Sequence, residues 1–215
     1  MKKSGLVMLF LVGTAFLLSA YLYPEMPGRM ATHWNAGGEP DGTLPKAAGA
    51  FMVPGIMALL AGLFAAVPRI DPLGRNLRKF RKQYGMFAGV VMGFLLVVHA
   101  QILLWNAGIL ISPLFIFPLG IAALFYAAGI LCENSRQNWF VGIRTPWTLS
   151  SSTVWKETHR LGAKLFKWAA AASLASVLVP DYSAAVIIAS ALIVAVFSTA
   201  YSYVLYRRET QGGKK

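Results

Sequence analysis

The sequence predicts an all-α protein, a polytopic membrane bundle of about six transmembrane helices with both termini in the cytoplasm. Three observations predict this fold class. Hydrophobic residues make up 57% of the 215 residues and charged residues only 13%, against roughly 25% charged residues in soluble domains. The apolar residues form charge-free runs of about 18 to 25 residues, which is the length of a membrane-spanning helix. The basic residues are concentrated between alternate runs.

Six apolar runs follow one another along the chain, and each is expected to form one span. The first begins after Lys2 and Lys3 like a signal peptide, but its apolar core is longer and no small-x-small cleavage site follows it. We therefore interpret it as a retained span. The fifth is the weakest, because Lys164 and Lys167 lie in its first turn and have to extend to the headgroups. The runs cover residues 4–23, 47–67, 84–105, 113–132, 162–179 and 183–206.

The distribution of Lys and Arg sets the orientation of these spans. Of 20 basic residues, only Arg29 and Lys46 fall on one side of the predicted membrane, and the other 18 fall on the opposite side. This positive-inside pattern predicts a multi-pass protein of the cell membrane with both termini inside. The net charge of +12 is then explained by topology and by contact with anionic membrane lipids, above all at residues 75–82. Direct nucleic-acid binding is not expected.

The whole chain is expected to form one integral membrane domain made of three consecutive parts. Residues 1–67 hold the first two spans and a structured extracellular loop, 24–46. Residues 68–132 hold a basic cytoplasmic loop, interpreted as ordinary, and spans three and four. Residues 133–215 hold a long cytoplasmic loop and spans five and six. The two long loops are dense in Gly, Pro, Asn, Trp and His, so we expect function to reside there.

The extracellular loop carries His33, Trp34, Asn35, Asp41 and Lys46 as candidate peptide-binding residues. Residues 35–38 and 40–42 have turn chemistry, which predicts that the loop folds back on itself. An imidazole, an indole and a carboxylate held by turns suit a pocket for a peptide or a cation. The alternative is that Trp34 anchors the loop at the interface while His33 and Asp41 satisfy backbone groups.

The cytoplasmic loop is expected to pack at the membrane interface or to dock a protein, and both readings stay open. The residue before Pro146 is restricted, which predicts an extended turn over residues 144–147, and the serines at 150–152 are helix N-cap candidates. Trp155, His159 and Gly162 then fall on one helical face. The candidate residues are Asn138, Gly142, Arg144, Thr145, Pro146, Trp147, Trp155, Thr158, His159 and Arg160.

No catalytic residue, metal site or cofactor is predicted, and an enzyme is not expected. His33 lies outside, His99 in the middle of the third span and His159 inside, so the three histidines cannot share one metal ion. The sequence has no H-E-x-x-H pair, nucleophile motif or phosphate-binding loop. His99 is the only ionisable residue at depth, and we expect it to be hydrogen-bonded inside the bundle, with a functional role as the alternative.

Both long loops resemble the SdpI family of bacterial and archaeal membrane proteins. The outer segment Met26-Pro27 … His33-Trp34-Asn35-Ala36-Gly37-Gly38 … Pro40-Asp41-Gly42 … Pro45-Lys46 is similar to the N-terminal domain of unknown function typical of that family. The inner segment from Asn138 through Gly142, Arg144-Thr-Pro-Trp147 and Val154-Trp155 to His159 and Gly162 is similar to its C-terminal signature. The chain departs from the family at Ser152 and Thr153, where members often carry acidic residues.

The resemblance implies immunity to, or sensing of, a secreted toxic peptide. It further implies that the outer loop meets the toxin and that the inner loop recruits a cytoplasmic repressor as part of signal transduction. Two alternatives remain from the residues alone. A transporter or flippase for peptide or lipid requires a polar cavity near His99, and a membrane-embedded enzyme requires an acid, a base and a nucleophile gathered on one face.

Overall fold

The computed structural model describes residues 2–212. Within this range, six helices are long and apolar enough to cross a membrane, which confirms the predicted polytopic helical fold. Lys214 and Lys215 of the predicted cytoplasmic tail lie outside the described residues. The six helices are α1 (Lys2–Leu22), α2 (Lys46–Ile70), α4 (Arg81–Asn106), α5 (Pro113–Asn134), α7 (Ser152–Ala175) and α8 (Ser183–Gly212).

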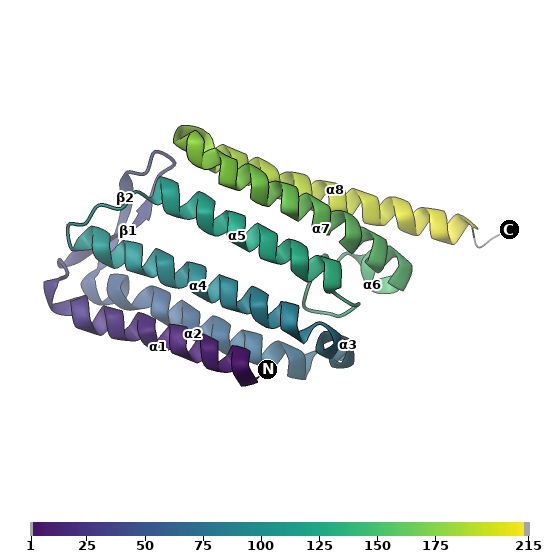
Figure 1. Ribbon diagram of the computed structural model, residues 1–215, viewed down its shortest axis with the longest axis horizontal. Coiled ribbons are helices and arrows are strands. Elements are labelled where there is room, and N and C mark those ends of the chain that lie inside the picture. Colours follow the sequence, from purple (N-terminus) through teal and green to yellow (C-terminus); the bar gives the residue numbers. More distant parts are fainter. Residues whose placement is uncertain (1, 213–215) are drawn as a thin grey trace.

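The helices pack side by side in two groups of three (Figure 1). Helices α1, α2 and α4 contact one another around a core that includes Met8, Met30, Met57 and Met92. Helices α5, α7 and α8 form the second group, in which α7 lies against both neighbours. The contact between α4 and α5 joins the groups. Large apolar side chains such as Phe10 and Phe197 remain exposed on the outer faces, as expected where a helix meets lipid rather than water.

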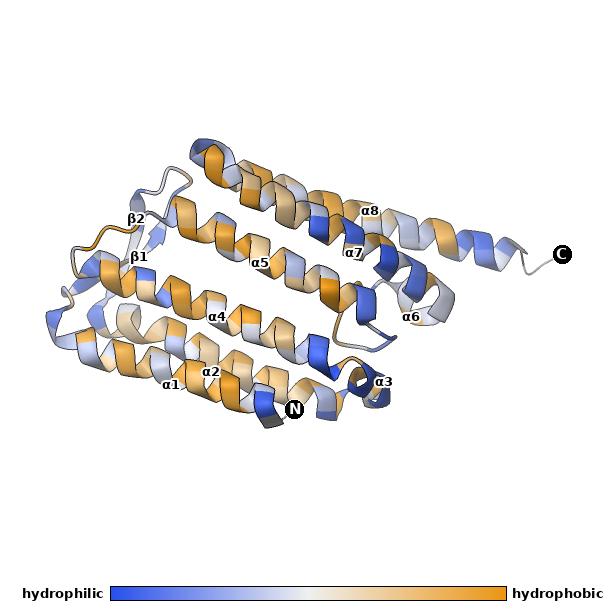
Figure 2. Cartoon of the chain, in the orientation of Figure 1, coloured by the Kyte–Doolittle hydropathy of each residue, from blue (hydrophilic) through white to orange (hydrophobic). Residues whose placement is uncertain are grey.

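Hydrophilic residues gather at the two ends of the bundle (Figure 2). The start of α1 and the end of α8 lie at the same end of the bundle as α3 (Gly74–Lys79) and α6 (Pro146–Ser150) (Figure 1). Arg29 and Lys46 lie at the opposite end, at the start of β1 and of α2. The charge asymmetry read from the sequence is therefore present in the folded bundle, and the positive-inside rule predicts that the basic end is the cytoplasmic one.

The fifth span begins ten residues earlier than the apolar run suggests. Helix α7 starts at Ser152 rather than near Gly162. The Ser151 hydroxyl accepts a hydrogen bond from the Val154 N–H at 3.2 Å, so one of the predicted serines is the N-cap. The amphipathic first three turns carry too many polar residues for a hydropathy run, although they continue the same helix.

Three short 3-10 helices and two strands complete the fold. The 3-10 helices are η1 (Tyr23–Glu25), η2 (Ser176–Leu178) and η3 (Pro180–Tyr182), and the strands are β1 (Arg29–Trp34) and β2 (Pro40–Pro45). The expected reversal of the extracellular loop at residues 35–38 is present and closes an antiparallel hairpin, but residues 40–42, also expected to turn, lie in β2. The strands were not recognisable in the sequence, because the extracellular loop is rich in Gly and Pro, which are depleted from ordinary strands.

Candidate functional site

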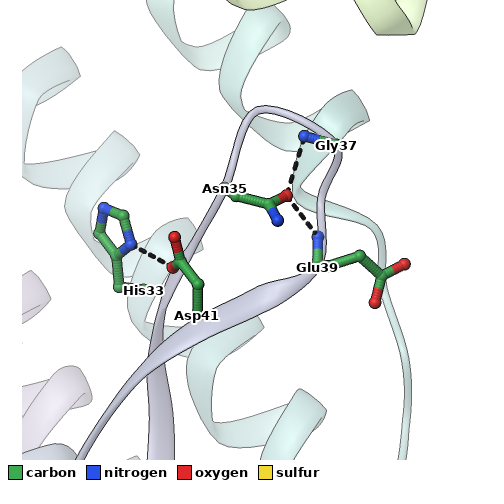
Figure 3. A network of polar contacts seen from close by, with 5 residues as sticks. All are labelled: His33, Asn35, Gly37, Glu39 and Asp41. Atoms are coloured by element: carbon green, nitrogen blue, oxygen red, sulfur yellow. Dashed lines mark hydrogen bonds and ion pairs between the residues drawn. The ribbon is translucent and has the colours of Figure 1, made fainter.

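The extracellular hairpin presents a His–Asp pair on its outer surface. The His33 Nδ1 atom lies 2.5 Å from Asp41 Oδ1, and the two side chains are 72% and 44% exposed. The register shifts on either side of His33, which pairs with Gly42. A Cβ atom on Gly42 would stand 2.9 Å from the Cβ of His33, so the close approach of the strands requires glycine at this position. Asp41 therefore orients the imidazole, and the second ring nitrogen points away from it (Figure 3).

Asn35 closes the hairpin turn with its side chain. Its Oδ1 atom accepts hydrogen bonds from the Gly37 N–H at 2.9 Å and from the Glu39 N–H at 3.1 Å (Figure 3). The Asn35 N–H donates to the Glu39 carbonyl at 2.9 Å, and Gly38 has a φ of 80°. This is Asx-turn chemistry, so the side-chain oxygen of Asn35 stabilises the turn by hydrogen bonding to the backbone.

The hairpin is fastened to the top of α4 by a residue that the sequence analysis missed. The Asn106 side chain accepts from the Ala31 N–H at 2.8 Å and donates to the Ala31 carbonyl at 2.9 Å, and so takes the place of a neighbouring strand. The Trp34 ring packs edge-on against Trp105 at 5.5 Å between centroids. An amide directly after the third predicted span, residues 84–105, was the only sequence signal for this contact.

Lys46 does not join His33 and Asp41. Its Nζ atom lies 3.3 Å from the Pro24 carbonyl oxygen and 4.7 Å from the centre of the Tyr23 ring. The ammonium thus holds the end of α1 against the start of α2. Of the five predicted outer residues, the structure brings His33 and Asp41 into contact, uses Asn35 in the turn, and places Trp34 in the hairpin's packing surface.

A cavity of about 420 Å³ lies beneath the hairpin. His33, Trp34 and Asn35 line its upper part, and apolar side chains of α4, α5 and α8 line the rest, among them Ile102, Phe117 and Ile187. The indole N–H of Trp34 is buried and has no acceptor among the residues that the structure describes. The cavity combines an apolar wall with a few polar groups at one side, which is typical of ligand pockets.

His99 is fully buried and links three helices. Its Nε2 atom lies 2.9 Å from Ser19 Oγ and 3.2 Å from the Ala15 carbonyl oxygen. The Ser19 hydroxyl donates to the Ala50 carbonyl at 2.6 Å, so Ser19 accepts from His99, and Nε2 carries the proton. The expected hydrogen bonding inside the bundle is therefore observed. His99 has no exposed surface.

At the cytoplasmic end, Asn138 folds the signature loop, residues 135–145, onto itself. Its Oδ1 atom accepts from the N–H groups of Phe140 (3.0 Å) and Val141 (2.7 Å), while its Nδ2 group donates to the carbonyls of Arg136 (2.8 Å) and Val141 (2.9 Å). The side chain is completely buried. All hydrogen-bonding capacity of the amide is used locally, so Asn138 shapes the loop rather than contacting a ligand.

The signature loop docks on the face of α7 formed by Trp155, His159 and Gly162. His159 Nδ1 donates to the Trp155 carbonyl at 2.8 Å, and Nε2 accepts from the Ile143 N–H at 3.0 Å. The Trp155 and His159 rings stack at 4.0 Å. Gly142 has a φ of 107°, and a Cβ atom there would collide with His159 Nε2. A Cβ atom on Gly162 would likewise collide with Ile143.

A short helix follows Thr145, which corrects the extended turn expected over residues 144–147. Thr145 itself is extended, as the following proline requires, but Pro146 is the first residue of α6. Thr145 and Thr148 form a capping box, in which each side chain accepts the other's N–H. The Thr145 hydroxyl also lies 3.0 Å from Ser202 Oγ of α8, and Trp147 packs on Tyr203 at 5.0 Å.

The cytoplasmic connection from 68 to 83 is part of the same assembly, which corrects its interpretation as an ordinary loop. Asp71 is 6% exposed; its Oδ2 atom accepts from the Trp139 N–H at 3.0 Å and its Oδ1 atom from the Leu73 N–H at 2.6 Å. Asn76 donates to the Gln137 carbonyl at 2.8 Å. The sequence analysis missed Asp71 and Asn76, because nothing local distinguishes them from solvated loop residues.

The remaining inner residues divide into exposed and buried ones. Trp139 is 51% exposed, and the Arg144 guanidinium donates to its carbonyl at 2.8 Å. Arg160 is exposed and lies 3.8 Å from Glu157. Thr158 is buried, and its hydroxyl has no partner among the described residues.

Within residues 2–212, no three His, Cys, Asp or Glu side chains stand close enough together to hold a metal ion.

Comparison with known proteins finds two matching family models and two similar proteins. Residues 134–202 match the SdpI/YfhL protein family, and residues 10–58 match a domain of unknown function (DUF1648). The chain is 25% identical to the immunity protein SdpI of Bacillus subtilis (strain 168) over 207 residues, which cover 96% of this chain and 97% of that protein. It is 38% identical to the uncharacterized membrane protein YbgB of the same organism over 58 residues, 27% of this chain and 64% of that protein.

No solved structure matches the chain. The two matched segments contain the extracellular hairpin and the cytoplasmic signature loop in the predicted order, and the similarity to the immunity protein extends across the spans between them. The chain is thus a multi-pass cell-membrane protein whose residues 134–202 match the SdpI/YfhL protein family.

Proposed function

We propose that this protein protects a cell against a secreted toxic peptide by binding the peptide at the extracellular hairpin. The observation that carries the proposal is the cavity of about 420 Å³ beneath that hairpin. An amphipathic peptide lying at the outer membrane surface presents an apolar face that the Ile102 and Phe117 walls would accept. Its polar groups would meet the outward ring nitrogen of His33. The similarity to an immunity protein over 96% of the chain supports this assignment.

The fastening of the hairpin supports a binding role as well. The bonds from Asn106 to Ala31 and the packing of Trp34 on Trp105 hold the hairpin in one place over the cavity. A preorganised site loses less conformational entropy on binding than a mobile loop does. The toxin would be held where it first contacts the membrane, before it inserts.

At the cytoplasmic end, the same proposal assigns repressor recruitment to the surface around the signature loop. Trp139, Arg144 and Arg160 are exposed there, and exposed Trp and Arg are the residue types enriched at protein interfaces. Hydrogen bonds from Asp71 and Asn138 hold the loop that presents them. Peptide binding outside would bias the packing of α4, α5 and α8, three helices that line the outer cavity.

The test is survival of a toxin-sensitive bacterium that expresses the parent protein or a variant at matched membrane level. His33→Ala removes the outward imidazole, and Gly42→Ala forces the two strands apart at His33. Both variants are expected to lose protection. Gly28→Ala is the matched control, because a Cβ atom at Gly28 meets nothing within 4 Å, and it should protect as the parent does.

Protection by both His33→Ala and Gly42→Ala at the parent's level would remove the hairpin from the binding site. Repressor recruitment is tested separately, by the amount of repressor that sediments with membranes in the presence of toxin. Arg144→Ala should lower that amount while leaving protection unchanged. Equal recruitment by the parent and by Arg144→Ala would contradict the assignment of the inner surface.

A further inference from the structure

A second cavity, of about 440 Å³, opens at the cytoplasmic end of the bundle. It lies between the α3–α4 junction, the end of α5 and the first half of α7. No residue of the extracellular hairpin contributes to it. We call it the basic cleft, because six cationic residues line it: Lys79, Arg136, Lys156, Arg160, Lys164 and Lys167.

The protein balances only part of the charge of the basic cleft, because Arg160 lies 3.8 Å from Glu157, which is outside the lining, and Lys167 pairs with Glu133. Glu133 is the only acidic residue among those that line it, and its Oε2 atom already pairs with Lys167 Nζ at 2.7 Å. Like charges held around one cavity repel, and this repulsion is screened in part because most of the cationic side chains are exposed to water. An anion bound in the cleft would relieve this repulsion and accept hydrogen bonds from the ammonium and guanidinium groups.

The floor of the basic cleft is apolar. Phe80, Cys132 and Ala163 line it and are 1%, 4% and 3% exposed. A further cavity of about 310 Å³ shares Cys132 as a wall residue and is lined by apolar side chains that include Phe87 and Phe166. A cationic rim, an apolar floor and an adjoining apolar cavity match a ligand that joins a phosphate to a hydrocarbon chain. A freely soluble anion has no hydrocarbon chain that could contact the apolar floor and the apolar cavity.

We propose that the basic cleft is a binding site for an anionic phospholipid of the inner leaflet. The headgroup phosphate lies among Arg136, Lys156 and Lys164, and an acyl chain follows the apolar cavity beside Cys132. Basic pockets between transmembrane helices at the cytoplasmic face bind lipid headgroups in this manner. The site differs from the exposed basic residues of α3, such as Arg75 and Arg78, which do not line the cleft. It is independent of the proposed outer function.

The experiment measures lipid binding to the purified full-length protein by native mass spectrometry, with titration of phosphatidylglycerol against phosphatidylcholine. Each cation near the headgroup contributes about fivefold in affinity, so Arg136→Gln with Lys164→Gln should weaken phosphatidylglycerol binding about 30-fold. Both side chains are exposed. Arg75→Gln with Arg78→Gln removes the same charge outside the cleft and should change the affinity less than twofold. Arg136→Lys with Lys164→Arg keeps the charges and should bind like the parent.

Three outcomes would overturn the proposal. Equal loss in the two double-glutamine variants would mean that lipid follows net surface charge and not the cleft. Equal binding of phosphatidylglycerol and phosphatidylcholine by the parent would mean that the cleft does not select an anion. Displacement of phosphatidylglycerol by millimolar inorganic phosphate, with the same loss in the cleft variant, would assign the site to a soluble anion instead of a lipid.

Discussion

Replacing Gly142 by alanine should release the signature loop from α7. The φ of Gly142 is 107°, a conformation that an L-residue adopts only under strain. The new Cβ atom would also collide with His159 Nε2, the atom that accepts the Ile143 N–H at 3.0 Å. One added methyl group therefore strains the backbone and breaks a hydrogen bond that holds the loop.

The expected magnitude follows from these two effects. Forcing a non-glycine residue into a sparsely populated backbone region costs about 1–3 kcal/mol. Loss of the hydrogen bond leaves the buried His159 nitrogen without a donor, which costs about 1–3 kcal/mol. Together they lower the free energy of loop release by about 2–6 kcal/mol, unless the loop shifts and recovers part of it.

Proteolysis of the purified protein measures this loop release directly, as the rate of cleavage within residues 135–145. The matched control is Gly55→Ala in α2, where a Cβ atom meets nothing within 4 Å and alanine should leave the loop unchanged. In the Gly142→Ala background, His159→Ala removes the atom that collides, so the two effects should be less than additive. A cleavage rate for Gly142→Ala equal to that of Gly55→Ala would refute the reasoning.

Two further predictions concern the contacts that the sequence did not reveal. Asp71→Ala should destabilise the signature loop by about 1.5–3 kcal/mol, because hydrogen bonds to a charged carboxylate are lost. The measurement is the rate of proteolysis near Trp139, which should rise. An unchanged rate would show that Asp71 does not hold the loop. Asn106→Ala removes the two hydrogen bonds that hold Ala31. Because about 1.4 kcal/mol corresponds to a factor of ten, amide hydrogen exchange at Ala31 should become roughly tenfold faster or more. Unchanged exchange would mean that Trp34 alone fastens the hairpin.

Much of the architecture was predictable, because it depends on local composition. Span three was placed within three residues of α4, and span four within two residues of α5. The face of α7 formed by Trp155, His159 and Gly162 followed from helical spacing, and the structure docks the signature loop on it. The hydrogen-bonded interior position of His99 followed from its depth in an apolar run.

The strands and loop contacts were not predictable in the same way. Residues 29–45 contain the turn formers that predict reversals, but the strands between them depend on pairing across the turn and on Asn106, 75 residues away from Ala31. The early start of α7 was missed because its first turns are polar. Pro146 was expected within an extended turn, and it begins α6 because Thr145 and Thr148 cap each other's N–H groups.

The sequence by itself determined the number of spans and the two loops that carry the matched segments, and it predicted the orientation of the spans. Span length and charge asymmetry are read residue by residue against a membrane of fixed thickness, so they need no knowledge of packing. Only the tertiary structure decided which residues meet. Asp71 reaches Trp139 across 68 positions, and the six cations of the basic cleft come from three separate segments. Such contacts depend on how the helices pack, because the charges and hydrogen-bonding groups that form them carry no local signal of their partners.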